Sequence, residues 1–238
     1  MFVDFLPFAG YFKRMTGKKK DFPVIRIIME NLIILFLDLF GTAVFAVTGA
    51  VQGIRRHLDI FGVTVLACCV GVGGGITRDC IIGCTPVAAF QDQYYIITCI
   101  AVGILSYISA GFWIRKRSIV KFCDAIGLGV FTAIGAQKGL DFGLNFTGIV
   151  LCGVFTSIGG GIIRDVLTGK IPVVLKSDFY ATASLIGGII FCLLIPLELP
   201  FFVNFMLVAT LVTTIRIVAI RCNLQLPAAG RFNSRSSR

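Results

Sequence analysis

One heptapeptide with two adjacent charges occurs twice in this chain, each time within an apolar stretch. The sequence Gly-Gly-Gly-Ile-x-Arg-Asp occupies Gly73–Asp79 and again Gly159–Asp165, 86 positions later. Charged side chains in apolar segments are costly, so they are usually paired or functional. Arginine and aspartate at a constriction can bind each other, or can repel and attract ions. The motif therefore predicts control of charge movement.

The similarity between the two copies extends beyond the heptapeptide without a gap. Asp38 aligns with Asp124, Gly41 with Gly127 and Pro86 with Pro172 at the same spacing of 86. Internal repeats that carry helix-breaking residues in apolar segments are typical of transport proteins. The sequence thus indicates a duplicated unit.

The composition indicates a membrane protein. Hydrophobic residues make up 57% of the chain and charged residues 14%, whereas soluble domains average about 25% charged residues. Runs such as Tyr94–Ile114 are apolar throughout and favour lipid-facing helices. The fold class predicted is an all-α membrane protein.

Seven transmembrane helices are expected. They are Asn31–Gly53, Ile60–Gly83, Gln93–Ile114, Phe122–Gly139, Asn145–Gly169, Phe179–Leu197 and Pro200–Arg221. Because three spans separate each residue from its repeat partner, the second repeat is inverted across the membrane. The organisation predicted is a basic, amphipathic segment (1–30), repeat 1 (31–117), repeat 2 (118–198), a seventh helix (199–222) and a disordered basic tail (223–238).

The net charge of +10 comes from basic residues in short loops and tails. Basic residues at these places orient the helices in the membrane, so the charge does not indicate nucleic-acid binding. Most basic residues close to predicted helix ends fall on the face that also holds Arg221. This places the C-terminus in the cytoplasm, although the basic residues of segment 1–30 fall on the opposite face.

Three consecutive glycines are expected to open the hydrogen-bond ladder of a helix at the bilayer midplane. The residues are Gly73, Gly74, Gly75, Gly159, Gly160 and Gly161. Freed carbonyls are tolerated at that depth only beside protein or a wet cavity, where they could replace the water around a cation. The alternative is that the glycines only let two helices pack closely.

The depths of the buried charges predict two ion pairs, Asp38 with Arg78 and Asp124 with Arg164. They are either clamps that hold the broken helices or gating elements in the pathway. Asp79 and Asp165 follow the arginines in sequence and should point elsewhere on their helices.

The two aspartates that follow the arginines, Asp79 and Asp165, could line a vestibule that attracts cations. No nucleophile, metal cluster or nucleotide-binding loop is recognisable. We therefore expect no enzyme, no cofactor and no metal beyond permeant monovalent cations.

The segment Asp38–Ala50, the doubled Gly-Gly-Gly-Ile-x-Arg-Asp block and Asp124–Phe131 resemble the prokaryotic trimeric intracellular cation (TRIC) channel family. That family is also catalogued as a glycine-transporter type of membrane domain. The resemblance covers about residues 31–222.

The resemblance implies a homotrimer of seven-helix protomers in the prokaryotic plasma membrane, among membrane lipids. Each protomer would conduct K⁺ or Na⁺ past helices two and five, kinked at their glycines. The expected function is a potassium channel. The alternative is a secondary transporter of glycine or a similar small solute, because inverted repeats with midplane breaks serve alternating access equally well.

Overall fold

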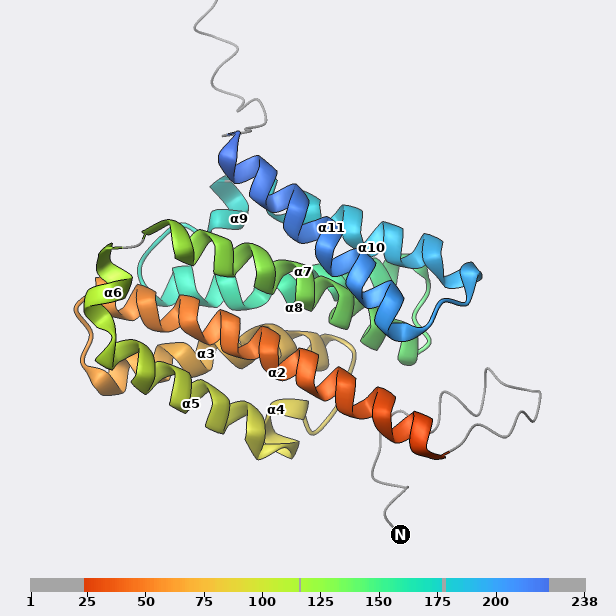
Figure 1. Cartoon of the computed structure of the whole chain (residues 1–238), viewed down its shortest axis with the longest axis horizontal. Coiled ribbons are helices and arrows are strands. Elements are labelled where there is room, and N and C mark those ends of the chain that lie inside the picture. The colour runs from red at the N-terminus through yellow and green to blue at the C-terminus, as the bar shows by residue number, and fades with distance from the viewer. Residues whose placement is uncertain (1–23, 116, 177–178, 223–238) are drawn as a thin grey trace, which may run out of the picture.

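The computed structural model describes residues 24–115, 117–176 and 179–222, and within these ranges it contains helices and no strand (Figure 1). The prediction of an all-helical membrane protein is confirmed. The N-terminal segment 1–30 lies mostly outside the described residues, and the tail 223–238 lies wholly outside them.

Seven main helices form the bundle. They are α2 (Val24–Arg55), α3 (Ile60–Ile81), α5 (Gln93–Ile108), α7 (Arg117–Asp141), α8 (Phe146–Leu167), α10 (Ala181–Leu194) and α11 (Phe201–Arg221). Four short helical segments connect them: α4 (Ala88–Gln91), α6 (Ala110–Arg115), α9 (Val173–Lys176) and η1 (Ile195–Leu197).

Five of the main helices, namely α2, α3, α7, α8 and α11, are long and apolar enough to cross a membrane. The other two, α5 and α10, are apolar but have only 16 and 14 residues. They are the third helix of each repeat, so the shortening affects the same position in both. The predicted seven full-length spans thus become five long helices and two short ones.

Several helix boundaries differ from the predictions, and α7 begins at Arg117, five positions before the expected Phe122. The first helix begins at Val24, seven positions before the expected Asn31. The predicted span Gln93–Ile114 is divided at Ser109. The hydroxyl of Ser109 donates to the carbonyl of Leu105 (2.7 Å) and accepts from the indole N–H of Trp113 (2.9 Å). Such local bonds from serine compete with the regular helix ladder.

The second helix of each repeat begins at an equivalent cap. The carboxylate of Asp59 accepts the backbone N–H of Gly62 (2.7 Å), and the amide oxygen of Asn145 accepts that of Gly148 (2.9 Å). Asp and Asn are favoured at this position because they bond an amide that the helix leaves unpaired. The duplication seen in the sequence is therefore preserved in local structure.

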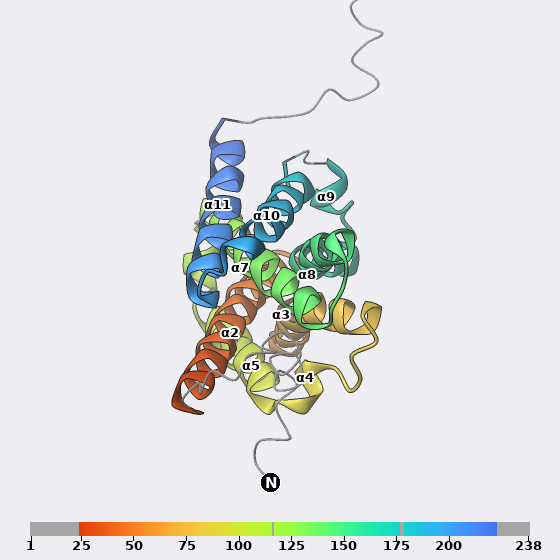
Figure 2. The same cartoon turned by 90° about the vertical axis from the view of Figure 1, so that its right-hand side faces the viewer.

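The packing also repeats. Helices α2, α3 and α5 contact one another, and α7, α8 and α10 do the same. The halves are joined where α3 contacts α8 and α2 contacts α7, while α11 packs on α7 and α10. Figure 1 shows α2 and α7 running in opposite directions, and Figure 2 shows α10 and α11 on one side of the bundle with α4 and α5 on the other.

Candidate functional site

The two glycine triplets lie where α3 crosses α8, and both helices continue through them without interruption. The predicted opening of the hydrogen-bond ladder is therefore wrong. A Cβ on Gly74 would lie 2.1 Å from the carbonyl oxygen of Thr156, and one on Gly160 would lie 2.5 Å from that of Val70. The glycines let two backbones touch, which is the packing alternative.

The third glycine of each triplet has a different environment. A Cβ on Gly75 would meet only Nη2 of Arg78, at 3.8 Å. Its repeat partner Gly161 lies at the same distance from Nη2 of Arg164, and close to the hydroxyl of Tyr180. The triplet of repeat 1 therefore combines helix packing with space beside Arg78, whereas the Tyr180 hydroxyl occupies the equivalent place beside Gly161.

Arg164 lies at the centre of a buried ionic cluster in repeat 2. Its Nη1 is 2.6 Å from Asp124 Oδ1, and its Nε is 3.0 Å from Asp165 Oδ1. Nη1 also donates to the hydroxyl of Thr48 on α2, at 3.3 Å. The exposed fractions of Arg164 and Asp124 are 6% and 7%. The cluster thus joins α7 and α8 of one repeat to α2 of the other.

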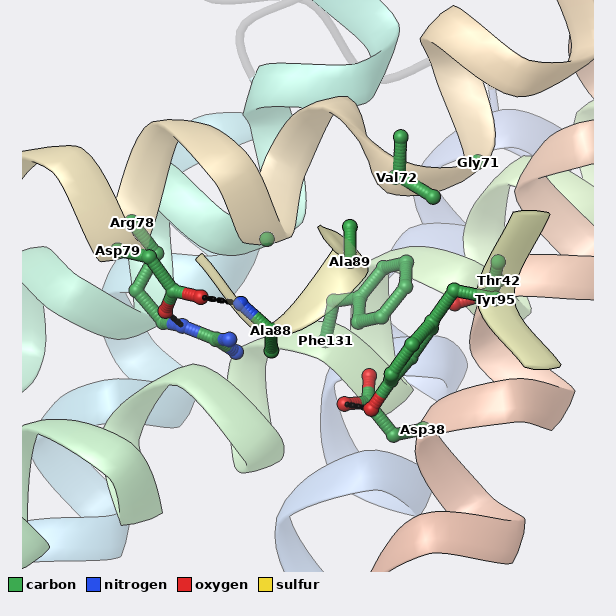
Figure 3. Close-up of a pocket in the computed structure, with 11 residues that line it drawn as sticks. Asp38, Thr42, Gly71, Val72, Arg78, Asp79, Ala88, Ala89, Tyr95 and Phe131 are labelled. Atoms are coloured by element: carbon green, nitrogen blue, oxygen red, sulfur yellow. Dashed lines mark hydrogen bonds and ion pairs between the residues drawn. The ribbon is translucent and has the colours of Figure 1, made fainter. Parts of the chain in front are cut away.

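The equivalent cluster in repeat 1 is arranged differently. Nε of Arg78 lies 2.8 Å from Oδ1 of the adjacent Asp79, and Asp38 accepts a hydrogen bond from the hydroxyl of Tyr95 at 2.6 Å (Figure 3). The predicted ion pair between Asp38 and Arg78 is therefore wrong. Tyr95, on α5, reaches the carboxylate of Asp38 instead.

Asp79 and Asp165 do not point away from the arginines. One oxygen of each carboxylate binds the preceding arginine, and the other accepts a backbone amide. The amides are those of Ala88 (2.9 Å) and Val173 (2.8 Å). Both carboxylates are buried, and they tie α3 and α8 to the short helices that follow them.

Sequence reasoning missed Tyr95 and Tyr180, which are repeat partners. From the third helix onward the spacing between the repeats falls from 86 to 85, which aligns Tyr95 with Tyr180 and Gly103 with Gly188. That one-residue shift was the available signal. Tyr180 is almost wholly buried, and the guanidinium of Arg216 on α11 lies 4.9 Å from the centre of its ring.

A small cavity lies among helices α2, α3, α4 and α5 of repeat 1, and α7 of repeat 2 closes one side of it. Its volume is about 20 Å³, which is room for about one water-sized particle. Figure 3 shows Asp38, Tyr95, Arg78 and Asp79 around it. The residues that line it are Asp38, Thr42, Gly71, Val72, Gly75, Arg78, Asp79, Ala88, Ala89, Tyr95 and Phe131.

Comparison with solved structures finds proteins that share this fold. The chain is similar to the TRIC trimeric intracellular cation channel orthologue from Rhodobacter sphaeroides, with 32% identity and a TM-score of 0.77 over 81% of this chain and 99% of that one. A prokaryotic TRIC channel crystallised in 0.5 M KCl gives 29% identity and a TM-score of 0.76, over 82% and 100% of the two chains. The chain belongs to the TRIC channel family.

Sequence comparisons find similar proteins in several bacteria. A family profile described as "Glycine transporter" matches residues 35–110 and again 121–196, one match for each repeat. The UPF0126 membrane protein of Vibrio cholerae is 40% identical over 84% of both chains. The UPF0126 inner membrane protein YadS of Escherichia coli is 36% identical over 82% of this chain and 96% of its own. With five helices long and apolar enough to cross a membrane in its described part, the protein is a multi-pass membrane protein.

Proposed function

We propose that the protein is a channel for monovalent cations, K⁺ among them, that assembles as a homotrimer with one pathway in each protomer. The observation that carries the proposal is the similarity to solved cation channels over nearly their whole length. The buried charge clusters on α3 and α8 suit such a role, because intramembrane ionisable groups usually mark ion pathways.

The pathway that we propose follows the small cavity beside the glycine crossing. Gly75 contributes open backbone to its lining, and Asp38 contributes a carboxylate. In the described part of the chain Asp38 has no cationic group within ion-pair distance, although the charges of Arg78 and Lys138 act on it, and in this proposal its carboxylate faces the cation. At about 20 Å³ the cavity is too small for a hydrated ion, which corresponds to a closed pathway.

The glycine triplets have two roles in this proposal. Gly74 and Gly160 hold α3 against α8, and Gly75 leaves room beside Arg78. Asp79 and Asp165 position those arginines and add negative charge near the path. The arginines would repel cations while the path is closed.

The membrane topology that we propose has seven spans, with repeat 2 inverted relative to repeat 1. The opposite directions of α2 and α7 support it, and the matched pairs of helices have the same contacts in both halves. Basic residues near helix ends, among them Arg55 and Arg221, support a cytoplasmic C-terminus.

A second candidate function is secondary transport of glycine, which the description of the matching family profile favours. Flux into liposomes separates the two functions. A channel passes labelled K⁺ or Rb⁺ down its gradient without saturation, whereas a glycine transporter gives saturable uptake of labelled glycine. We expect cation flux and no glycine uptake above protein-free liposomes. Saturable glycine uptake without cation flux would replace the channel proposal.

A further inference from the structure

A second cavity lies at the C-terminal end of α2, apart from the residues of the proposed pathway. Its volume is about 570 Å³. Four of the residues that line it carry basic side chains, namely Arg55, Arg56, His57 and Lys170. We refer to these four residues as the basic corner. No carboxylate lines this cavity in the described part of the chain.

The basic corner is assembled from separate parts of the fold. Arg55 ends α2, Arg56 and His57 form the turn that follows, and Lys170 belongs to the connection between α8 and α9. Nη2 of Arg55 donates to the carbonyl of Trp113 at 3.3 Å. Burial and the nearby Arg56 lower the pKa of Lys170. Like charges are thus held together at this cavity.

The repeat provides an internal comparison, because the same turn occurs after α7 without these charges. The partners of Arg55, Arg56 and His57 are Asp141, Phe142 and Gly143, and the partner of Lys170 is Cys84. Both turns close with a backbone hydrogen bond of 3.1 Å, from Leu58 to Gly53 and from Leu144 to Gly139. The fold of this turn therefore does not require the basic residues.

His57 adds a further contrast with its repeat partner. It has a φ of 58°, and Gly143 has a φ of 70°. Glycine adopts this left-handed region without strain, whereas a residue with a Cβ does not. The turn of repeat 1 carries an imidazole at a position where the backbone would favour glycine.

The surroundings of the basic corner are apolar. Ile54 and Ile114 line the same cavity. Ile114 and Phe112 are more than half exposed, and the ring of Phe112 packs edge-on against Trp113. Tryptophan and its aromatic neighbours are typical of the membrane interface. An occupant of this cavity would therefore have an anionic group beside the cations and a hydrocarbon part along Phe112 and Ile114.

We propose that the basic corner binds the phosphate of an anionic membrane phospholipid. Arginine side chains match the geometry of phosphate oxygens, and a basic pocket at the membrane surface favours anionic headgroups. The apolar side chains next to the cavity favour a lipid over a free phosphate ion. This proposal does not depend on ion conduction.

Lipid retention by the purified protein tests the proposal. The full chain in detergent is mixed with phosphatidylglycerol or phosphatidylcholine, and bound lipid is measured by native mass spectrometry. The test variant is Arg56→Gln/Lys170→Gln, in which both residues are exposed. The matched control is Arg115→Gln/Arg221→Gln, which removes the same charge from two exposed residues outside the cavity. A third variant, His57→Gly, carries the glycine that repeat 2 has at the equivalent position, Gly143.

We expect the wild type and the control variant to retain phosphatidylglycerol in preference to phosphatidylcholine. The test variant should lose that preference by about fivefold for each charge removed, and His57→Gly should fold and bind less. Equal losses in test and control variants would overturn the proposal, because general surface charge would then explain binding. Displacement of the lipid by millimolar inorganic phosphate would overturn the assignment to a lipid.

Discussion

Tyr95 donates a hydrogen bond of 2.6 Å to Asp38, and both residues line a cavity of about 20 Å³. Asp124, the repeat partner of Asp38, is bound by Arg164 at 2.6 Å. The two aspartates are equivalent in sequence, but among the described residues only Asp124 lies within ion-pair distance of its arginine. In the proposed pathway, breaking the hydrogen bond from Tyr95 would release the carboxylate of Asp38 to a passing cation.

The first prediction concerns this hydrogen bond. In Tyr95→Phe the ring remains and the donor is lost, so Asp38 is no longer held across the cavity. Hydrogen bonds to charged groups contribute about 1.5–3 kcal/mol, so the open probability should rise by about tenfold. Single-channel recording measures it. The neighbouring Tyr94→Phe is the control because Tyr94 is exposed, and equal behaviour of the two variants would rule out Tyr95 as a gate.

The second prediction concerns cation preference. Asp38→Asn removes the negative charge from the proposed pathway while it keeps the size of the side chain. We expect a lower unitary K⁺ conductance and a reversal potential shifted toward that of Cl⁻, because a carboxylate concentrates cations. Asp59→Asn is a suitable control, since Asp59 caps α3 at an exposed position. An unchanged reversal potential and conductance in Asp38→Asn would place the path elsewhere.

The third prediction concerns stability and distinguishes the two aspartates. Removing one partner of a buried ion pair leaves an uncompensated charge, which costs about 3–5 kcal/mol. Asp124→Asn should therefore lower the temperature at which detergent-solubilised protein loses its size-exclusion peak. Asp38→Asn, which keeps an oxygen that can accept from Tyr95 and breaks no ion pair described above, should lower it less. The reverse order would contradict the different partners described for the two residues.

The fourth prediction concerns the glycine crossing. A Cβ at Gly74 would lie 2.1 Å from the backbone of Thr156, so Gly74→Ala must push α3 away from α8. Overpacking of this kind costs about 1–3 kcal/mol. Gly75→Ala adds the same methyl group next to Arg78 Nη2 at 3.8 Å and should be tolerated. The same thermal measurement compares them, and similar losses from both would refute the packing role of Gly74.

The sequence predicted those features of the fold that follow from its apolar runs and from its internal repeat. The repeated motif and the apolar runs were sufficient for an all-helical, duplicated membrane protein. Asp124 and Arg164 lie at matching depths, and the structure places them in contact. Asp38 and Arg78 also lie at matching depths, yet Asp38 contacts Tyr95. Depth along two helices does not determine which third helix supplies a competing partner.

Other details depend on competition between individual hydrogen bonds and packing contacts, which a sequence pattern does not reveal. The division between α5 and α6 follows from the two hydrogen bonds of Ser109. The triple glycines favoured a helix break, with a close crossing of two helices as the alternative. The neighbouring backbone carbonyls of Thr156 and Val70 explain the crossing, and they come from helices distant in sequence.

The proposal of a cation channel is tested most directly by recording from purified trimers in a planar bilayer under a KCl gradient. The account predicts discrete current steps that reverse near the K⁺ equilibrium potential and become more frequent in Tyr95→Phe. Reversal near the Cl⁻ equilibrium potential, or no steps from protein verified to be inserted and trimeric, would contradict it.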